Sequence, residues 1–358
     1  MRKSYISIAI LCSCAILSKY LVILPEYMVK YVGNAAWMNV LAKCIIASIS
    51  LTIILFLYKP FAPMTIKDVC NTYLGRGAGI VFSYIYIIAF TVFNAILLRL
   101  LSEALSTVIA TTAPDEFFAL FILVPVFIAA YCGTNPTRNL CCIIFPFVVI
   151  TFLTVCFALL PHYRTENIMP ILGTDTNKLI DGIFTKHFGF METVLLFFFA
   201  PRLGDFKQLK KSAVLTFTII TSVSVIFTLA YCLTVPYPAS KDFFLPFYQM
   251  TRMIKSGAFL QRLEPIVVFV WTSFVMCSMS VLIAVASKLA AGVLPEGTDK
   301  SFTPVITLIT FFVSMLPASE SYAFIFYEKL INISTLFFPV IPFVVLFIAR
   351  IRKKAVTL

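Results

Sequence analysis

Long runs of apolar residues recur along the chain and are separated by short polar segments. A helix needs about 20 apolar residues to cross the hydrocarbon layer of a bilayer, because that layer is roughly 30 Å thick. Ten runs of this kind predict ten transmembrane helices. The expected spans are 5–24, 37–58, 78–101, 117–133, 140–160, 188–201, 213–235, 265–290, 303–316 and 331–349.

The composition supports a protein that lies almost entirely in lipid. Hydrophobic residues make up 61% of the 358 residues and charged residues 12%, and the mean hydropathy is +0.99. A soluble domain has about 25% charged residues, so a water-soluble globule is excluded. The predicted fold class is therefore an all-α polytopic membrane protein that forms a single transmembrane domain over residues 1–358.

The distribution of charge predicts the orientation in the membrane. An even number of spans places both termini on one side, and the loops and tails of that side hold 16 of the 28 Lys and Arg residues. The opposite loops hold 9 basic residues and 11 of the 16 acidic residues. Basic residues collect on the cytoplasmic side, so both termini should be cytoplasmic. The net charge of +12 thus reflects topology. No stripe of basic and aromatic residues indicates a nucleic-acid partner.

Cysteines, histidines and glycines give no sign of a metal or a cofactor. Most of the ten cysteines fall within predicted spans, where they act as small packing residues. His162 and His187 have no neighbouring second ligand pair. The glycines of residues 75–79 lack the spacing of a nucleotide-binding loop. No hydrolase or metalloprotease motif is present either, so we predict that the protein is not an enzyme.

Four ionisable residues stand out inside the predicted spans, where a charge costs about 2.5 to 3.5 kcal/mol on insertion scales. Arg99 lies within one turn of its predicted helix end, so we expect its side chain to reach the interface. Lys43 either reaches the interface or pairs with a neighbouring helix, or else belongs to a site. Lys19 and Glu192 are more informative because both interrupt apolar runs.

Helices one and six are predicted to be broken. Residues 18–20 interrupt the first apolar run before Pro25, and Glu192 interrupts an unusually short sixth run before Pro201. These helices hold matching places in two five-helix halves, 1–160 and 188–350. Matched interrupted helices mark the binding site in transporters built from inverted repeats. We therefore predict a five-plus-five inverted repeat, and the alternative is a ten-helix bundle without internal symmetry.

The same reasoning selects the candidate ligand-binding residues. The interrupted helices and the polar or aromatic positions of helices three and eight supply Ser18, Lys19, Tyr20, Asn94, Phe190, Glu192, Thr193, Trp271 and Ser273. Several have structural alternatives: Tyr20 and Trp271 fit interfacial aromatic belts, and Asn94 fits a hydrogen bond between helices.

The external segment before helix eight is too long for a simple connector. Its apolar residues recur at helical spacing between positions 247 and 254, which predicts an amphipathic helix on the outer surface. Arg262 and Glu264 would then lie at the interface.

At this segment the sequence resembles the B subunits of bacterial spore germinant receptors. These subunits form the GerAB/GerKB family of the amino acid-polyamine-organocation superfamily. The most specific matches run from Phe244 through Arg252, Gly257 and Glu264 to Trp271, together with residues 166–172 before helix six. Supporting matches are Leu24 and Pro25, Glu192, and the basic stretch 201–211. The resemblance covers nearly the whole chain.

The resemblance implies a leucine-transporter-like fold in the inner membrane of a spore, working with germinant receptor A and C subunits. It also implies a small nutrient germinant, often an amino acid, held between helices one, three, six and eight. Lys19 departs from the small residues usual at the break of helix one. It would repel an ammonium group, and three roles are open: attracting an acidic germinant, replacing a coupling cation, or pairing with Glu192.

We therefore expect a germinant-sensing subunit that signals to its partner subunits to start germination. The alternative is a proton-coupled symporter for amino acids or organic cations, in which Lys19 or Glu192 titrates during alternating access. Both have the same fold. Apart from the germinant and the two subunits, the expected contact is membrane lipid.

Overall fold

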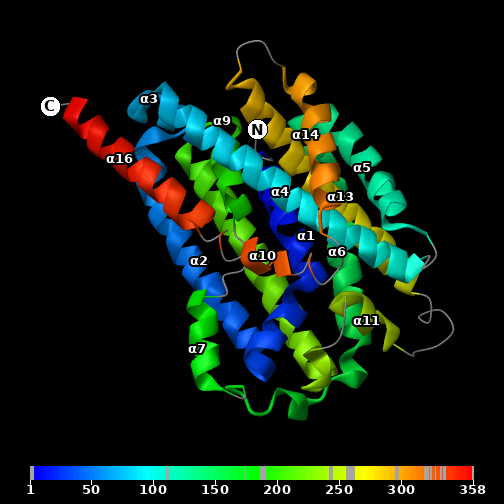
Figure 1. Ribbon diagram of the computed structural model, residues 1–358. Helices are drawn as coiled ribbons and strands as arrows, with labels where there is room; N and C mark the ends of the chain where they lie inside the picture. Colours follow the sequence, from blue (N-terminus) through cyan, green and yellow to red (C-terminus); the bar gives the residue numbers. More distant parts are fainter. Residues whose placement is uncertain are drawn as a thin grey trace.

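The computed structural model describes residues 4–109, 113–173, 175–185, 191–241, 245–254, 263–294, 298–317, 322, 325–326, 328–330, 333 and 336–356. Within these ranges every regular element is a helix, as the apolar runs predict. Figure 1 shows the long helices lying roughly side by side, with short helices covering the ends of the bundle.

The first half of the chain contains α1, four more long helices and three short elements. In order these are α1 (Ser4–Val32), η1 (Gly33–Ala35), α2 (Ala36–Tyr58), η2 (Lys59–Phe61), α3 (Ile66–Leu74), α4 (Arg76–Ile109), α5 (Asp115–Tyr131) and α6 (Thr134–Ala158). The connection to the second half holds η3 (Leu160–His162), η4 (Thr165–Ile168) and α7 (Thr176–Thr185).

The second half begins with short pieces and continues with long helices. The short pieces are η5 (Met191–Val194), α8 (Leu195–Phe198) and α9 (Ala200–Leu203). Then follow α10 (Phe206–Thr234), η6 (Ala239–Lys241), α11 (Pro246–Arg252), α13 (Leu263–Ala291), α14 (Asp299–Ser314), the π-helix η7 (Leu336–Val340) and α16 (Ile341–Val356).

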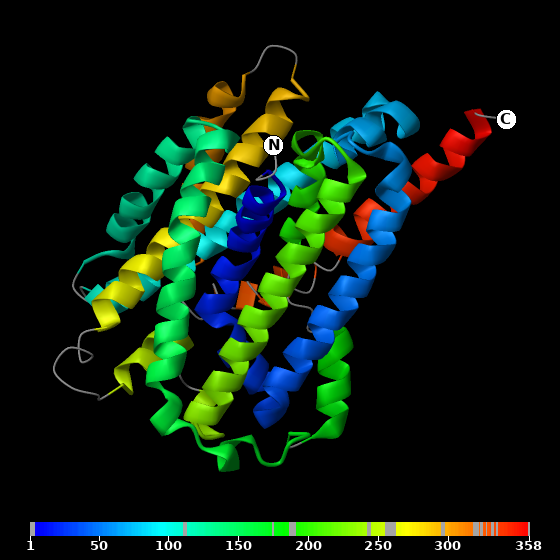
Figure 2. The same cartoon turned by 180° about the vertical axis from the view of Figure 1, so that it is seen from behind.

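Helices α1 and α13 form the centre of the bundle. Helix α1 packs against α10, α13 and α6, while α13 also packs against α4, α5 and α14. From Leu11 to Tyr20 every side chain of α1 is buried, in accordance with its place inside the ring of helices seen in Figures 1 and 2. A helix that is apolar on all sides is one that other helices surround.

The outer faces of α2, α5 and α6 are apolar and exposed. Large side chains on these faces are 46% to 62% exposed, and within each helix they recur every three or four residues: Ile45, Ile49, Ile53, Phe56, Phe117, Phe121, Val124, Ile128, Ile143, Phe147 and Ile150. Continuous apolar surface of this extent is not stable in water. The protein is an integral membrane protein, and lipid covers these faces.

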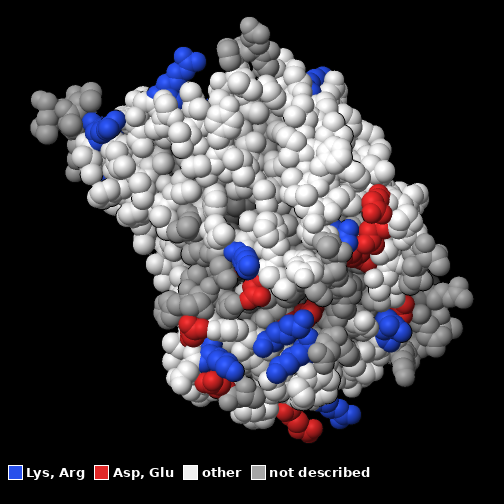
Figure 3. All heavy atoms as spheres, in the orientation of Figure 1, with Lys and Arg blue, Asp and Glu red and all other residues white. Residues whose placement is uncertain are grey.

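Charged side chains gather at the two ends of the molecule. On the face drawn in Figure 3, the upper end carries Lys and Arg, the lower part carries both signs, and a broad uncharged band separates them. Figure 1 places the described ends of the chain at the same end of the bundle. That end also holds α3 and α9, while α7 and α11 lie at the opposite end.

Five helical segments are long and apolar enough to cross a membrane, among the residues that could be searched: Pro25–Phe61, Arg76–Ile109, Thr134–Ala158, Phe206–Thr234 and Leu263–Ala291. The predicted span 5–24 lies within the continuous helix α1, and the remaining predicted spans correspond to shorter or interrupted helices. Helices α5, α14 and α16 have 17, 16 and 16 residues, and part of the predicted span 331–349 lies outside the described residues.

The break predicted in helix one is wrong, because α1 is continuous from Ser4 to Val32 with Pro25 inside it. The polar residues there are accommodated by contacts with other helices, so the backbone does not need to unwind. In the sixth span an interruption is present: residues 191–203 form a 3-10 turn and two four-residue helices. Pro201 at the start of α9 has no N–H to donate to the preceding helix.

Two helices outside the ten predicted spans are amphipathic. Helix α3 buries Ile66, Val69 and Cys70 on one side, and α7 lies at the other end of the bundle. The predicted helix between positions 247 and 254 exists as α11, and it buries Phe247 against the rings of Phe152 and Phe227. Residues 242–244 and 255–262, including Arg262, lie outside the described part of the chain.

The start of α3 gives a local prediction. The Thr65 hydroxyl accepts a hydrogen bond from the Asp68 N–H at 3.1 Å, which caps the helix. Thr65→Ala should therefore destabilise α3 by about 1 kcal/mol. We expect faster hydrogen exchange at the amides of α3 with no change in α4. Thr298→Ala is the matched control, because Thr298 precedes α14 without capping it. Equal effects of the two substitutions on their helices would contradict this account.

Candidate functional site

A buried ion pair joins α1 to η5. The Lys19 Nζ atom lies 2.6 Å from Glu192 Oε2, and the two side chains are 2% and 1% exposed. A third element contributes Phe93 of α4, whose ring centre is 4.6 Å from the same ammonium. A lone charge at such a place would be strongly unfavourable, so each partner neutralises the other. The pair thus links two separate parts of the chain inside the bundle.

Helix α13 reaches the same region through hydrogen bonds to backbone carbonyls. The Ser278 hydroxyl donates to the Ala15 carbonyl of α1 at 3.2 Å, and the Ser18 hydroxyl donates to that carbonyl at 3.4 Å. The side-chain amide of Asn94 in α4 donates to the Met279 carbonyl at 3.3 Å. Four elements, α1, α4, η5 and α13, therefore meet around Lys19.

Two buried polar atoms at this junction have no hydrogen-bond partner among the described residues. They are the Thr193 hydroxyl beside Glu192 and the Asn94 carbonyl oxygen beside Phe93. Leaving a buried donor or acceptor unpaired costs about 1 to 3 kcal/mol. Folded proteins rarely keep such groups without a reason, and one reason is a ligand that completes the hydrogen bonds.

The structure brings most of the predicted site residues to this junction. Ser18, Lys19 and Tyr20 are buried on α1, Asn94 is buried on α4, and Glu192 and Thr193 are buried on η5. On α13, Trp271 is buried and Ser273 is half-buried. They precede Ser278 by seven and five residues, which places them about 8 to 10 Å away along the helix axis. Phe190 lies outside the described residues.

Two contributors to the junction were not among the predicted site residues. Ser278 is a polar residue inside an apolar span, and that signal could have selected it in addition to Ser273. Phe93 has no such signal, because it is one of 37 phenylalanines in the chain.

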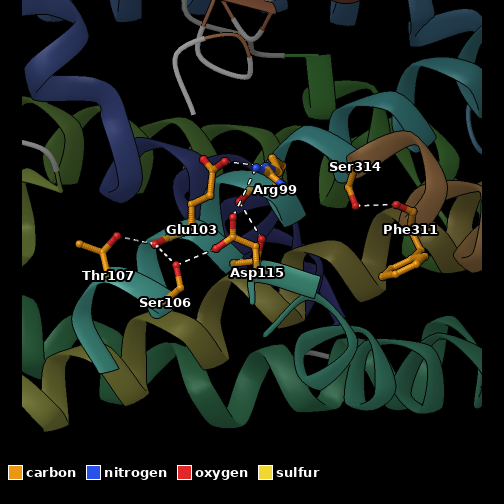
Figure 4. Close-up of polar contacts among 8 residues, drawn as sticks. Arg99, Glu103, Ser106, Thr107, Asp115, Phe311 and Ser314 are labelled. Carbon is orange, nitrogen blue, oxygen red and sulfur yellow. Dashed lines mark hydrogen bonds and ion pairs between the residues drawn. The ribbon is translucent and has the colours of Figure 1, made fainter. Parts of the chain in front are cut away.

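Arg99 does not lie within one turn of a helix end, contrary to the predicted span 78–101, and its side chain is buried. Helix α4 continues to Ile109, and Arg99 is 8% exposed. Its Nε lies 2.6 Å from Glu103 Oε1 and its Nη2 lies 3.3 Å from Asp115 Oδ2 (Figure 4). The apolar run ends near position 101, but the pairing of Arg99 with Glu103 one turn later lets the helix continue.

Lys43 is also buried, between α2 and α1. Its ammonium donates a hydrogen bond to the Met28 sulfur at 3.2 Å, and the residue is 3% exposed. Pairing with a neighbouring helix was one of the two interpretations of this lysine.

No cluster of His, Cys, Asp or Glu among the described residues has an arrangement that would hold a metal ion. All ten cysteines are free thiols.

The sequence is similar to those of spore germination proteins. A family model described as "Spore germination protein" matches residues 4–323. Spore germination protein YndE of Bacillus subtilis (strain 168) is 22% identical over 321 residues, which covers 89% of this chain and 88% of that protein. Spore germination protein KB of the same organism is 25% identical over 278 residues, with 74% and 72% covered.

Solved structures of low sequence identity share the fold. Mhp1, a nucleobase-cation-symport-1 family transporter in a closed conformation with bromovinylhydantoin bound, has a TM-score of 0.64 at 12% identity and covers 91% of this chain and 74% of its own. A manganese transporter mutant of Eremococcus coleocola has a TM-score of 0.60 at 10% identity, with 99% and 85% covered. The helices described above are thus arranged as in transporters of the leucine-transporter-like fold.

Proposed function

The chain belongs to the spore germination protein family, whose model matches residues 4–323, and from this premise we propose that it is the nutrient-sensing membrane subunit of a spore germinant receptor. The family is one of transporters and germinant receptors, so the protein is not an enzyme. The ligand of this proposal is a small nutrient such as an amino acid. Its binding signals to partner subunits that germination should start.

The observation that carries this proposal is the buried Lys19–Glu192 ion pair, with the Thr193 hydroxyl beside it unpaired among the described residues. A ligand that enters the junction of α1, α4, η5 and α13 would meet a positive group, a negative group and the Thr193 hydroxyl. In our proposal the ligand is held by Ser18, Lys19, Tyr20, Asn94, Phe190, Glu192, Thr193, Trp271 and Ser273.

The pair also suggests how binding becomes a signal. While the ion pair is intact, α1 and η5 are held together through their side chains. A ligand that takes over the hydrogen bonds of Lys19 or Glu192 removes that link and favours a second packing of the two elements. A ligand shifts an equilibrium by its difference in affinity for the two states, and this exchange of partners supplies such a difference.

Partners and location complete the proposal. Family membership supports assembly with germinant receptor A and C subunits in the inner membrane of the spore. The excess of Lys and Arg in the loops on the side of the termini supports cytoplasmic termini. The fold shared with solved transporters supports ten membrane helices in two inverted repeats, 1–160 and 188–350.

Thr193→Val tests the site without disturbing the ion pair. Valine has nearly the shape of threonine but lacks the hydroxyl, which has no partner among the described residues. We expect the variant to be as stable as the native protein or more so, because an unpaired buried group is removed. A nutrient that raises the melting temperature of the native protein should bind about tenfold more weakly to the variant. The measurement is the melting temperature of purified protein against a nutrient panel.

Thr228→Val is the matched control, because its buried hydroxyl already bonds to the Ser224 carbonyl within α10. It should leave nutrient binding unchanged. Native-like nutrient binding by Thr193→Val would remove this hydroxyl from the site, and loss of binding in the control would show that the effect is not local.

A second candidate is a proton-coupled symporter for amino acids or organic cations. The observation in its favour is that both similar solved structures are transporters by their descriptions. The two functions separate in proteoliposomes that contain the protein and a nutrient already shown to bind. A sensor should bind this nutrient without concentrating it, whereas uptake driven by a proton gradient and abolished by Glu192→Gln would establish the symporter.

A further inference from the structure

A cavity separate from the Lys19–Glu192 junction lies at the end of the bundle away from the termini. Its volume is about 370 Å³, and it is bounded by the last turns of α4, by α5, by α11 and by the first turns of α13. Most of its wall is apolar. Three polar residues line it as well, namely Tyr248, Glu264 and Thr272.

Both signs of charge occur at the α11 side of the cavity. The Tyr248 hydroxyl donates to Glu264 Oε2 at 3.4 Å. Burial raises the pKa of Tyr248, and the negative charge of the nearby Glu264 raises it further. The Tyr248 hydroxyl therefore stays protonated and remains a hydrogen-bond donor. Arg252 follows Tyr248 by four residues on α11 and is exposed, so the two lie on one face of the helix. The Glu264 carboxylate and the Tyr248 phenol thus line the cavity, and the Arg252 guanidinium lies outside the lining, one helical turn from Tyr248.

Deeper along α13, the cavity meets a polar atom without a partner. Thr272 is 8% exposed, and its hydroxyl has no hydrogen-bond partner among the described residues. Other buried threonines in this protein, such as Thr228 and Thr307, bond to the carbonyl four residues earlier. Thr272 lies about 12 Å along the helix from Glu264, because eight residues separate them. The cavity is thus polar at both ends and apolar between.

One side of the cavity opens towards lipid. Ile109, Phe121 and Phe269 line it and are 62%, 61% and 73% exposed, on the apolar outer face of the bundle. A molecule in the cavity can therefore extend a hydrocarbon chain over this rim into the bilayer.

Polar contacts hold the wall formed by α4 and α5 in place. Asp115, the first residue of α5, accepts a hydrogen bond from Ser106 at 2.8 Å and forms an ion pair with Arg99 at 3.3 Å, as Figure 4 shows. These contacts hold the start of α5 against the end of α4, next to the lining residues Leu105 and Ile109. The cavity is thus formed by a fixed pair of helices.

We propose that this cavity binds one aminophospholipid of the surrounding membrane. The Glu264 carboxylate receives the primary ammonium of the headgroup, Arg252 faces the phosphate, and the Thr272 hydroxyl donates to an ester carbonyl. The acyl chains lie over Ile109, Phe121 and Phe269. A zwitterionic headgroup matches the two charges, and the ester supplies the acceptor that Thr272 lacks.

The test is lipid-dependent stabilisation of the purified full-length protein in detergent. Phosphatidylethanolamine, phosphatidylglycerol and phosphatidylcholine with identical acyl chains are titrated, and the melting temperature is followed. We expect phosphatidylethanolamine to stabilise the protein at the lowest concentration, because phosphatidylglycerol has no ammonium and the choline headgroup has no N–H. Glu264→Gln should weaken the apparent affinity for phosphatidylethanolamine by about tenfold and leave that for phosphatidylglycerol unchanged. Thr272→Val should weaken the affinity for both lipids, because the ester carbonyl that it contacts is common to them.

Glu116→Gln is the matched control, since Glu116 is an exposed acid in the first turn of α5 that does not line the cavity. It should respond to phosphatidylethanolamine as the native protein does. Equal stabilisation by phosphatidylethanolamine and phosphatidylglycerol would overturn the proposal, as would a native response in both Glu264→Gln and Thr272→Val. Equal stabilisation by soluble phosphoethanolamine would also overturn it, because the site would then bind the headgroup without the lipid. If Glu264→Gln does not fold, Thr272→Val alone decides.

Discussion

Lys19→Met should destabilise the folded protein by about 3 to 5 kcal/mol, and Glu192→Met by a similar amount, because each leaves its partner's charge buried and unpaired. The Lys19 Nζ atom lies 2.6 Å from Glu192 Oε2, and both side chains are 2% exposed or less. Water therefore cannot replace a missing partner. We expect each single variant to melt well below the native protein in detergent. Lys210→Met, at an exposed position of α10, should change the free energy of unfolding by no more than about 0.5 kcal/mol.

The double variant Lys19→Met with Glu192→Met separates structure from function. Two apolar side chains of similar volume remove both buried charges, so most of the lost stability should return. The nutrient response of spores should not return, because in our proposal the ligand exchanges partners with these charged groups. A double variant that folds and responds like the native protein would mean that the pair only stabilises the bundle.

The membrane fold was predictable from the sequence because apolar runs and membrane thickness fix the rough position of long helices. The predicted span 37–58 and helix α2 (Ala36–Tyr58) agree to within one residue. The predicted resemblance to germinant receptor B subunits is confirmed by the family match over residues 4–323. Motifs spread along the chain carried that prediction, since no single residue would have been specific.

Helix ends and breaks were harder to predict, because they depend on side-chain partners far along the chain. The sequence predicts a break of α1 at Lys19, but Glu192, 173 residues later, neutralises this lysine and the helix continues. Pairing with Glu192 was one of three roles that the sequence left open for Lys19. Helix α3 was missed even though Thr65 and Asp68 have the spacing of a capping box, because a short amphipathic helix adds no long apolar run.

The depth of side chains within the membrane was the least predictable part of the site. Sequence alone places a residue on a helix only to within about one turn. Trp271 and Ser273 were selected on α13, while the hydrogen bond to α1 comes from Ser278. The contact between Phe93 and the Lys19 ammonium depends on how α4 crosses α1, which no local pattern encodes.

Arg99→Met is expected to have the other large effect on stability, about 3 to 5 kcal/mol, because Arg99 is the basic partner of both Glu103 and Asp115. Without Arg99, the Glu103 and Asp115 carboxylates both lose their positive partner. The Glu103 side chain is only 8% exposed, so water compensates poorly for this loss. Asp115 is 28% exposed and keeps its hydrogen bond from Ser106, so the penalty should arise mainly at Glu103. The measurement is the melting temperature, together with hydrogen exchange at the end of α4 and the start of α5.

The double variant Arg99→Met with Glu103→Met tests this assignment, since it removes the buried charge together with its partner and should recover most of the stability. Arg76→Met is the control at the exposed start of the same helix, and it should have almost no effect. If the double variant is as unstable as Arg99→Met, the loss arises from Asp115 and the junction of α4 with α5. Faster exchange confined to that junction would then accompany it, and the wall of the lipid cavity would depend on Arg99 directly.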